Sequence, residues 1–232
     1  YSDDGVTFHG AYGYRWRKHF GFDQLELAAE LLKKNPDDRR IVIGMWDPRV
    51  DFGKEGKDFP CNTAIKFRIV DGRLDMTVEN RSNDMIWGAY GANAVHFSML
   101  QEYMAAKIGV SLGHYWQVST NFHSYMDTLK KHSALLIVDP TDTPYHAGEV
   151  TPFPMVQDIN VWDRELEMFM QEGDGAIGYT EPFFKRVAIP ILQSHRAFKA
   201  KDYVTAAGIA IGSCVAKDWS RAISEYVERR AK

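Results

Sequence analysis

A predicted β-hairpin limits the fold more than any other stretch of this sequence. Residues 63–70 and 74–79 alternate between apolar and polar side chains, as strands with one buried face do. The dipeptide Asp71-Gly72 between them is typical of the tight turns that join antiparallel strands. Pairing about this turn brings residues near position 62 opposite residues near position 81. We therefore expect Cys61 and Arg81 to meet at the open end of the hairpin.

The order of the other predicted elements favours an α+β fold, with strands in the first two thirds of the chain and helices around and after them. Strands are predicted over residues 41–43, 63–70, 74–79 and 115–120. Helices are predicted over residues 23–34, 94–108, 122–132, 182–197, 201–215 and 218–232. Asp23 is placed to cap the first helix. Residues 47–57 and 139–154 are expected to be loops, and 232 residues suffice for a single domain with one core.

Charge and cysteine content narrow the class of partner. A net charge of −3 gives no bulk attraction to nucleic acid, so individual arginines must hold any anion. Two cysteines, Cys61 and Cys214, form neither a disulfide framework nor a metal-ligand spacing, which favours a reducing, cytoplasmic setting without a metal. No apolar run suits a membrane span and no signal peptide is recognised. Because the chain opens on Tyr1 rather than methionine, we expect further residues upstream.

Cys61 is a candidate nucleophile. A free thiol has a pKa of about 8.5, so it needs a neighbouring cation or donor to become a thiolate at neutral pH. The hairpin supplies Arg81 for that role. The alternative is a buried structural cysteine, which is the commoner role for a lone cysteine.

Other polar residues suit a nucleotide. Arg39 and Arg40 could hold a phosphate through paired hydrogen bonds, although a solvated basic pair at a helix end is the simpler interpretation. Ser82 offers a hydroxyl to a phosphate beside Arg81. Asn93 can donate and accept, as the amide edge of a pyrimidine requires, and it could also cap the following helix.

His123 and Tyr125 are two residues apart, so on a strand they would share a face and could reach one sugar hydroxyl. A histidine such as His123 is more often simply packed. Three tryptophans are expected mainly in the core, although one could stack on a flat cofactor: Trp16, Trp46 and Trp87. Taken together with Cys61, these residues point to covalent chemistry on a nucleotide.

In order along the chain, these residues resemble characteristic segments of the thymidylate synthase superfamily. The segments are Tyr12-Gly13-Tyr14-Arg15-Trp16-Arg17, Asp23-Gln24, Asn35-Pro36-Asp37-Asp38-Arg39-Arg40, Trp46, Pro60-Cys61, Arg81-Ser82, Asp84, Gly88, Asn93, His123 and Tyr125. The set covers residues 12–125, roughly half the chain, and its order is specific although no single segment is. The resemblance implies a mixed β-sheet packed against helices.

The resemblance also implies a reaction. Cys61 would add to C6 of a pyrimidine nucleoside monophosphate, and C5 would then attack the one-carbon unit of 5,10-methylenetetrahydrofolate. Arg81 and Ser82 would hold the phosphate near the thiol. Arg39 and Arg40 would reach the partner's phosphate across a homodimer interface.

The same resemblance assigns the remaining contacts. Asn93 would read the base edge, and His123 and Tyr125 would bind the 3′-hydroxyl of the sugar. Asp84 would contact the pterin. Trp16 and Gly88 would belong to the folate site.

Departures from the synthase pattern point to phage-type hydroxymethylases. Asn62 stands where synthases have a histidine after the nucleophile, and we count it among the catalytic residues. The loop over residues 47–58 is longer than in short synthases. Together with Asp58-Phe59-x-Cys61 and Arg81-Ser82-Asn83-Asp84, it resembles the phage deoxycytidylate hydroxymethylases. Those enzymes add water where synthases add hydride.

Other departures concern the base and the ends of the chain. The cytidylate enzymes have aspartate at the base-reading position, whereas Asn93 is what uracil readers have, and its placement requires one inserted residue within 89–92. The family's upstream arginine loop and catalytic glutamate have no match, so they precede Tyr1 or are absent. The helical region 162–232 does not resemble a synthase tail.

We therefore expect hydroxymethylation of dUMP by a homodimer that uses methylenetetrahydrofolate, in a phage DNA-modification setting within the host cytoplasm. The nearest alternatives are a thymidylate synthase that makes dTMP and a hydroxymethylase that acts on CMP or dCMP. A nucleotide-binding module without catalysis is a further alternative. Neither a nucleic acid nor a membrane is expected as a partner.

Overall fold

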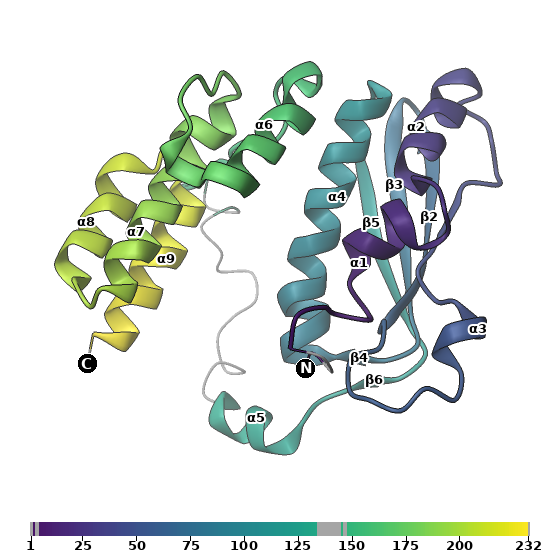
Figure 1. Cartoon of the computed structure of the whole chain (residues 1–232), viewed down its shortest axis with the longest axis horizontal. Coiled ribbons are helices and arrows are strands. Elements are labelled where there is room, and N and C mark those ends of the chain that lie inside the picture. Colours follow the sequence, from purple (N-terminus) through teal and green to yellow (C-terminus); the bar gives the residue numbers. More distant parts are fainter. Residues whose placement is uncertain (1, 3–4, 134–144, 146–147, 232) are drawn as a thin grey trace. The chain divides into compact units, whose positions relative to one another are not determined.

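The computed structural model describes residues 2, 5–133, 145 and 148–231. The chain forms two compact units, Tyr1–Leu136 and Ile137–Lys232. The first unit contains the β-sheets, and the described part of the second contains helices without strands (Figure 1). A single domain over residues 1–232 remains a prediction. None of the helices in the described ranges is both long and apolar enough to cross a membrane.

The first unit is built on a mixed four-stranded sheet in the order β1-β2-β3-β5. Strands β1 (Val42–Gly44), β2 (Asn62–Val70) and β3 (Arg73–Asn80) pair antiparallel, whereas β5 (Ser111–Ser119) runs parallel to β3. A second, two-stranded parallel sheet joins β4 (Asn83–Asp84) to β6 (Phe122–His123). The expected α+β fold with a mixed sheet is thus confirmed.

The predicted hairpin forms with the expected turn. Asp71 and Gly72 have φ of 49° and 72°, and two successive positive φ angles are the signature of the turn that matches strand twist. From this turn the strands pair in one register up to Ala64 opposite Glu79, and a shift of one residue between Asn62 and Ala64 then places Asn62 opposite Asn80. The N–H of Arg81 then donates to the carbonyl of Cys61 at 3.0 Å, so the predicted meeting of these two residues is confirmed.

One face of the sheet is covered by helices α2 (Gln24–Lys34) and α4 (Asn93–Ile108). Apolar strand residues are buried beneath them, namely Ile43, Ile65, Phe67, Met76 and Val78. The Asp23 carboxylate accepts hydrogen bonds from the N–H groups of Leu25 and Glu26, so it caps α2 as expected.

Shorter elements surround this core. Helix α1 (Tyr12–Tyr14) continues into the π-helical turn η1 (Arg15–His19). The predicted loop over residues 47–57 contains a short helix, α3 (Pro48–Asp51), because Asp47 caps its first turn. The predicted helix over residues 122–132 is wrong in its first part, since β6 comes first and α5 begins only at Met126 (Met126–Lys131).

Another correction concerns Asn93, which is not a helix cap. The π-helical turn η2 (Met85–Ala92) precedes α4 and runs into it, and Asn93 itself has helical angles. The Asp84 carboxylate is the actual cap, since it accepts from the N–H groups of Ile86 and Trp87 at 3.0 and 2.6 Å. Gly91 within η2 has non-helical angles, φ −117° and ψ −123°, and the insertion expected within 89–92 stays a prediction.

The second unit consists of α6 (Ile159–Glu172), η4 (Gly173–Gly175), η5 (Phe184–Ala188), α7 (Ile189–Lys199), α8 (Tyr203–Ser213) and α9 (Lys217–Arg230). The three predicted C-terminal helices are confirmed within a few residues. Trp162 and Phe184 stack at 4.7 Å in its core. The buried carboxylate of Glu165 accepts from the N–H groups of Thr180 and Glu181, which ties the connecting loop to α6. Half of the predicted loop over residues 139–154 lies outside the described residues, and its described part, residues 145 and 148–154, contains no helix or strand.

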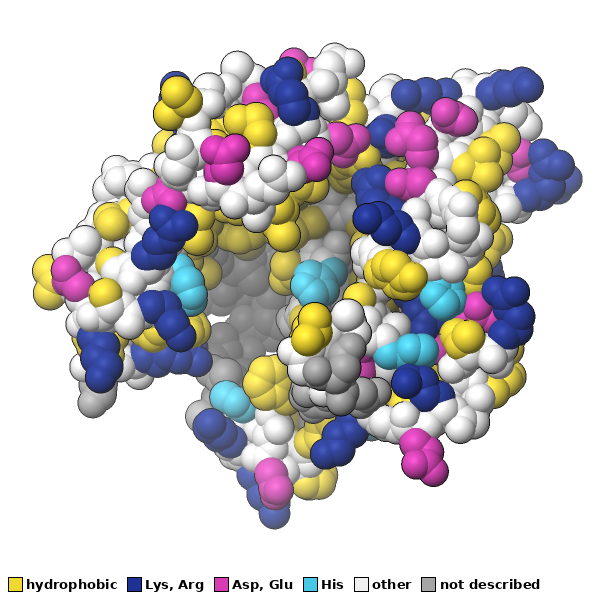
Figure 2. Space-filling view, viewed as in Figure 1, with side chains coloured by type: hydrophobic (Ala, Val, Ile, Leu, Met, Phe, Trp, Pro, Cys, Tyr) yellow, Lys and Arg dark blue, Asp and Glu magenta, His cyan; other side chains and the backbone are white. Residues whose placement is uncertain are grey.

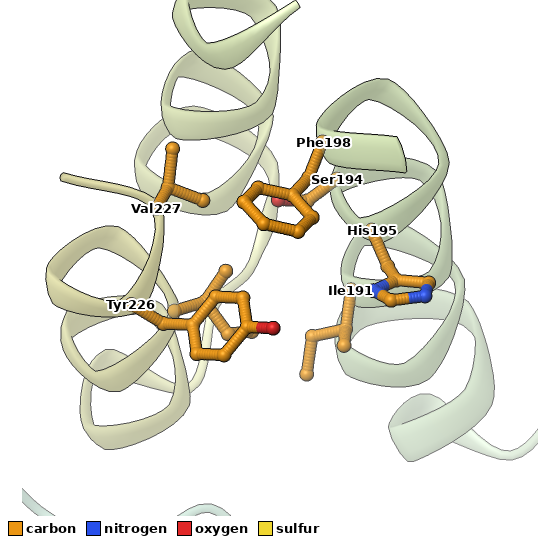
Figure 3. Close-up of a pocket in the computed structure, with 7 residues that line it drawn as sticks. Ile191, Ser194, His195, Phe198, Tyr226 and Val227 are labelled. Carbon is orange, nitrogen blue, oxygen red and sulfur yellow. The ribbon is translucent and has the colours of Figure 1, made fainter. Parts of the chain in front are cut away.

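A small hollow lies between α7 and α9 (Figure 3). Its lining is mostly apolar, with Phe198 and Tyr226 in contact at 5.2 Å between ring centroids. The hydroxyl of Ser194 in this lining already donates to the carbonyl of Ala206 at 2.7 Å. In the view of Figure 2, positive and negative side chains are interspersed on both units, which agrees with the small net charge.

The hairpin turn gives a direct test of the fold. Gly72→Ala places a Cβ on a residue with φ of 72°, so we expect a loss of about 1 kcal/mol in the free energy of unfolding. Gly13→Ala is the matched control, because Gly13 lies in a helix with open space at its Cβ position. Urea unfolding measures both variants. Equal effects of the two substitutions would contradict the assigned turn.

Candidate active site

Cys61 lies half-buried at the open end of the hairpin, and Arg81 holds its peptide from one side. Besides the backbone bond, the Nε of Arg81 donates to the carbonyl of Pro60 at 2.9 Å. The guanidinium carbon lies 5.3 Å from the ring centre of Trp46, within cation–π range. Arg81 is therefore fixed beside the candidate nucleophile by two hydrogen bonds and an aromatic ring.

Tyr12 approaches the same cysteine, although the sequence marked it only as part of the family segment. Burial, and next the neighbouring Cys61, raise the pKa of the Tyr12 hydroxyl, while the N–H groups of Cys61 and Asn62 act in the opposite direction. The phenol therefore stays protonated at neutral pH. Tyr12 packs on Trp16 and Phe97, with ring centroids 6.1 and 5.7 Å apart.

A chain of side-chain amides starts beside the thiol. The Nδ2 of Asn62 donates to the Oδ1 of Asn93 at 3.3 Å, and the Nδ2 of Asn93 donates to the Oδ1 of Asn83 at 3.1 Å. Asn83 in turn donates to the Oε1 of Gln117 and to the Oγ of Ser119, both at 3.0 Å. The structure thus brings together two predicted site residues, Asn62 and Asn93, and it adds Asn83 and Gln117, which sequence reasoning missed.

Gly88 is adjacent to this chain. A Cβ at this position would lie 2.4 Å from the Oδ1 of Asn83 and 3.0 Å from the Nδ2 of Asn93. Any larger residue would therefore collide with the hydrogen bond between the two amides. The packing therefore requires a glycine at position 88 whether or not folate binds there. The predicted place of Gly88 in the folate site stays a prediction.

The second small sheet gathers three other predicted residues. β4 and β6 pair Asp84 with His123, and the N–H of Tyr125 donates to the Oδ2 of Asp84 at 3.4 Å. The rings of His123 and Tyr125 meet edge to face at 5.4 Å. Their contacts with sugar and pterin stay predictions.

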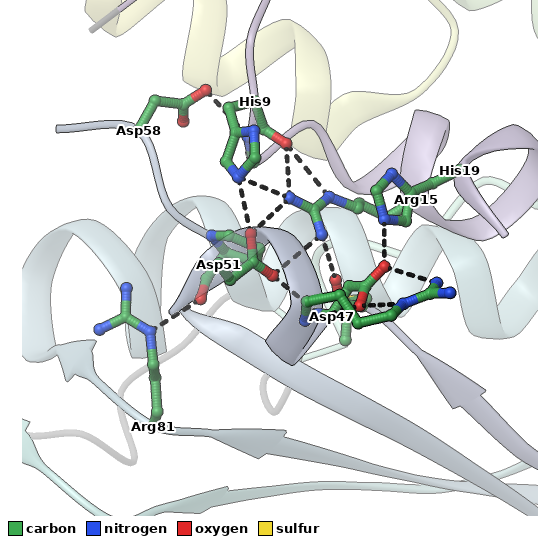
Figure 4. Close-up of polar contacts among 11 residues, drawn as sticks. His9, Arg15, His19, Asp47, Asp51, Asp58 and Arg81 are labelled. Atoms are coloured by element: carbon green, nitrogen blue, oxygen red, sulfur yellow. Dashed lines mark hydrogen bonds and ion pairs between the residues drawn. The ribbon is translucent and has the colours of Figure 1, made fainter. Parts of the chain in front are cut away.

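Buried charges hold the loop that precedes Cys61 (Figure 4). The Arg15 guanidinium is fully buried and donates to both oxygens of Asp51, at 3.0 and 2.8 Å. It also donates to the carbonyls of His9 and Met45. The Nε2 of His9 lies 2.6 Å from the Oδ1 of Asp51. This cluster therefore ties the N-terminal segment to α3.

The same network extends to both sides of α3. Burial alone would raise the pKa of Asp51, but bonds from Arg15, the N–H of Asp47 and His9 outweigh it and lower the pKa. Asp47 bonds Arg49 and also His19, and its pKa is lowered chiefly by Arg49.

Arg39 and Arg40 lie far from the thiol of their own chain. Since Val42 pairs with Lys66, Arg40 lies opposite the far half of β2, about 20 Å along the strand from Asn62 at 3.3 Å per residue. The carboxylate of Asp38 binds Arg40 through two hydrogen bonds, at 3.0 and 2.7 Å. Within one chain, therefore, the structure does not bring the arginine pair to Cys61.

Two other predictions are the place of Trp16 in the folate site and the absence of a metal. Trp16 packs in the aromatic cluster with Tyr12, and its Nε1 is buried without a partner among the described residues. Its place in the folate site stays a prediction. In the described ranges, no three His, Cys, Asp or Glu side chains are grouped as metal ligands, and the expectation of no metal stays a prediction as well.

Comparison with known proteins agrees with this geometry. A family model described as thymidylate synthase matches residues 1–174. Over an alignment of 242 positions, the chain is 52% identical to the deoxyuridylate hydroxymethyltransferase of Pseudomonas phage M6. The alignment covers 99% of this chain and 69% of that protein. The protein of the same description from Delftia phage PhiW-14 is 31% identical over 210 residues, covering 82% and 58%. The one from Bacillus phage SP01 is 39% identical over 138 residues, covering 55% and 36%.

The chain therefore belongs to the thymidylate synthase family. The resemblance inferred from the sequence is confirmed, and with it the class of enzyme, the one-carbon transferases of this superfamily. The chain spans between about one third and two thirds of the length of these three phage relatives.

The buried ion pair predicts a pH-dependent stability. Asp51→Asn leaves the Arg15 charge buried without a counter-ion, so at pH 7 we expect a loss of about 3–5 kcal/mol in the free energy of unfolding. Because the folded pKa of Asp51 is lowered, its contribution is complete above the unfolded value of about 3.9 and is lost as the pH falls through the folded pKa. The difference between wild type and variant should shrink at acid pH.

Urea unfolding at pH 7 and pH 3 measures this difference. The control is Glu26→Gln, which removes an ion pair with Lys107 in which the glutamate is about half exposed and should cost under about 1 kcal/mol. A variant Asp51→Asn as stable as the control at pH 7 would contradict the role of the cluster.

Proposed function

We propose that this protein hydroxymethylates C5 of dUMP with 5,10-methylenetetrahydrofolate as the one-carbon donor. The observation that carries the proposal is the position of Cys61. Its carbonyl accepts from the N–H of Arg81, and the next residue, Asn62, donates to the side chain of Asn93. The descriptions of the phage relatives support the same activity. The nucleotide would lie with its base at Asn93 and C6 at the thiol.

The chemistry follows from covalent activation. The Cys61 thiolate adds to C6, and the electron pair displaced to C5 attacks the methylene carbon of the folate. Loss of the C5 proton and cleavage of the bond to the folate nitrogen leave tetrahydrofolate and an exocyclic methylene. Water adds to that methylene, the bond between sulfur and C6 breaks, and hydroxymethyl-dUMP leaves.

The remaining predicted roles form part of the proposal. Arg81 uses its Nε for Pro60, and its terminal nitrogens remain for a phosphate that Ser82 would also bind. Asn62, a predicted catalytic residue, would act beside the base-reading amide to which it donates, and His123 and Tyr125 would hold the sugar. The folate would contact Asp84, with Trp16 and Gly88 nearby.

A thymidylate synthase is the main alternative, because the family includes such enzymes and a putative thymidylate synthase of Methanothermobacter marburgensis is 38% identical over 130 residues, 56% of this chain and 57% of that protein. Hydroxymethylation is favoured by Asn62, which stands where synthases have histidine. A CMP or dCMP hydroxymethylase is disfavoured by Asn93, because the cytidylate enzymes that the sequence resembles have aspartate at this position.

Product analysis tests the reaction directly. With dUMP and methylenetetrahydrofolate, mass spectrometry should find a nucleotide heavier by one CH₂O unit, together with tetrahydrofolate. Cys61→Ser should reduce turnover by at least about a thousandfold, because the covalent step is lost. The control is Cys214→Ser, a buried cysteine of the second unit, which should keep activity. A gain of one CH₂ unit with dihydrofolate would identify a thymidylate synthase instead.

The proposed homodimer would form on the open face of the main sheet. Val42, Lys66, Thr77 and Trp116 lie in one row across the four strands, on the face away from α2 and α4. Val42, Trp116 and Val118 are 53%, 55% and 54% exposed on this face. Exposed apolar side chains on a sheet indicate an interface. A second copy on this face would bring Arg39 and Arg40, which directly precede β1, to the boundary between the chains.

Subunit complementation tests the shared site. Cys61→Ser and the double variant Arg39→Ala with Arg40→Ala should each be inactive alone. Mixed dimers contain one site with an intact cysteine and the partner's intact arginines, so random mixing should restore about a quarter of wild-type activity. Full activity of the double arginine variant, or no recovery in mixed dimers confirmed by native mass spectrometry, would refute the cross-subunit role.

A further inference from the structure

The amide chain beside Cys61 has a fixed direction, and a backbone carbonyl sets it. The Nε2 of Gln117 donates to the carbonyl of Ala89 at 2.9 Å, and a carbonyl can only accept. The Oε1 of Gln117 must then face the other way, where it accepts from the Nδ2 of Asn83. Asn83 consequently turns its Oδ1 toward Asn93, whose Nδ2 must face it.

This order of donors and acceptors fixes the Asn93 carboxamide. Reversal of Asn93 would place its Oδ1 against the Oδ1 of Asn83, and both residues are buried. Two facing acceptors without a hydrogen are costly in a buried site. Asn83 cannot reverse in response without losing the bond to Gln117.

The other end of the chain is not fixed in this way. Asn62 donates to the Oδ1 of Asn93, but its own Oδ1 is buried with no hydrogen-bond partner among the described residues. Reversal of Asn62 would set this oxygen against the Oδ1 of Asn93, so Asn62 takes its direction from Asn93 and does not set it. The constraint on Asn93 comes from the side of Asn83 and Gln117.

The direction of the Asn93 carboxamide determines which pyrimidine base it can pair with. Each carboxamide group has two N–H donors and two carbonyl lone pairs, and the chain uses one of each at Asn93. One donor and one acceptor remain, in a fixed order. Uracil presents an acceptor at O4 beside a donor at N3, whereas cytosine presents a donor at N4 beside an acceptor at N3. A reversed carboxamide would match cytosine.

We propose that Asn83 and Gln117 are positioning residues that fix the direction of the Asn93 carboxamide and thereby set the preference for uracil over cytosine nucleotides. This inference rests on the proposed function, since it requires a pyrimidine base at Asn93. Gly88 belongs to the same arrangement, because its missing side chain leaves room for the bond between Asn83 and Asn93.

The experiment compares nucleotide selectivity in the full-length protein. Affinities for dUMP and dCMP are measured by calorimetry without folate, and kcat/KM for both is measured with it. Wild type should prefer dUMP in both assays. Asn83→Ala removes the acceptor that faces Asn93, and the preference should fall by at least about tenfold, mainly through improved use of dCMP.

Matched variants separate direction from general damage. Asn83→Asp keeps an oxygen facing the Nδ2 of Asn93, and its other oxygen, protonated in this buried position, can still donate to the Oε1 of Gln117, so the preference for dUMP should be retained. Gln117→Leu frees Asn83 to reverse and should lower the preference too, and it carries the test if Asn83→Ala does not fold. Asn93→Asp serves as the reference for cytosine use.

Two results would overturn the inference. One is an unchanged ratio in Asn83→Ala or Gln117→Leu while the affinities for both nucleotides fall alike. The other is an equal loss of preference in Asn83→Asp and Asn83→Ala. Failure of the proposed function would be seen separately. If the wild type selects dUMP in calorimetry but forms no hydroxymethyl product, the base site is retained and only the proposed reaction is refuted. Wild type that binds neither nucleotide refutes both.

Discussion

The pairing register of the β2–β3 hairpin is the constraint on which the site depends. Side chains alternate between the two faces of a sheet, so a shift of one residue would move every side chain to the opposite face. The observed register places Asn62 opposite Asn80 and joins the backbones of Cys61 and Arg81. The tight turn at Asp71-Gly72 sets the register as far as Ala64 opposite Glu79, and a shift of one residue between Asn62 and Ala64 completes it at the open end. The candidate nucleophile and its cation are therefore positioned by backbone geometry before any side chain contributes.

Around this hairpin, the first unit buries several polar and charged side chains. Arg15, Asp51, Asn62, Asn83 and Asn93 are all buried. Such groups destabilise a fold unless they are paired, and here Arg15 pairs with Asp51 while the asparagines bond one another. The ion pair fixes the segment before Cys61, and the amides fix the residues after it. The proposed function gives a reason for the buried amides, since an apolar core would stabilise the fold but could not direct an amide at a base.

Much of the site was predictable because its parts are close to regular elements. The meeting of Cys61 and Arg81 followed from a hairpin between strands that are close in the chain. Asn83 and Gln117 were not predictable as partners of Asn93. They lie on different strands, β4 and β5, and a sequence does not give the direction of a side-chain amide. The helix-cap interpretation of Asn93 failed because local sequence could not show that a π turn capped by Asp84 comes first.

By itself the sequence determined the hairpin, the cap of α2, the mixed α+β class and the family, because each depends on residues close together in the chain or on their order. Only the tertiary structure decided that Arg15 and Asp51 form a buried pair, that Tyr12 lies beside Cys61, and that Gly88 must lack a side chain. It also separated Arg39 and Arg40 from the thiol of the same chain. These contacts depend on distances between segments that are remote in sequence, and the packing of helices on the sheet sets those distances.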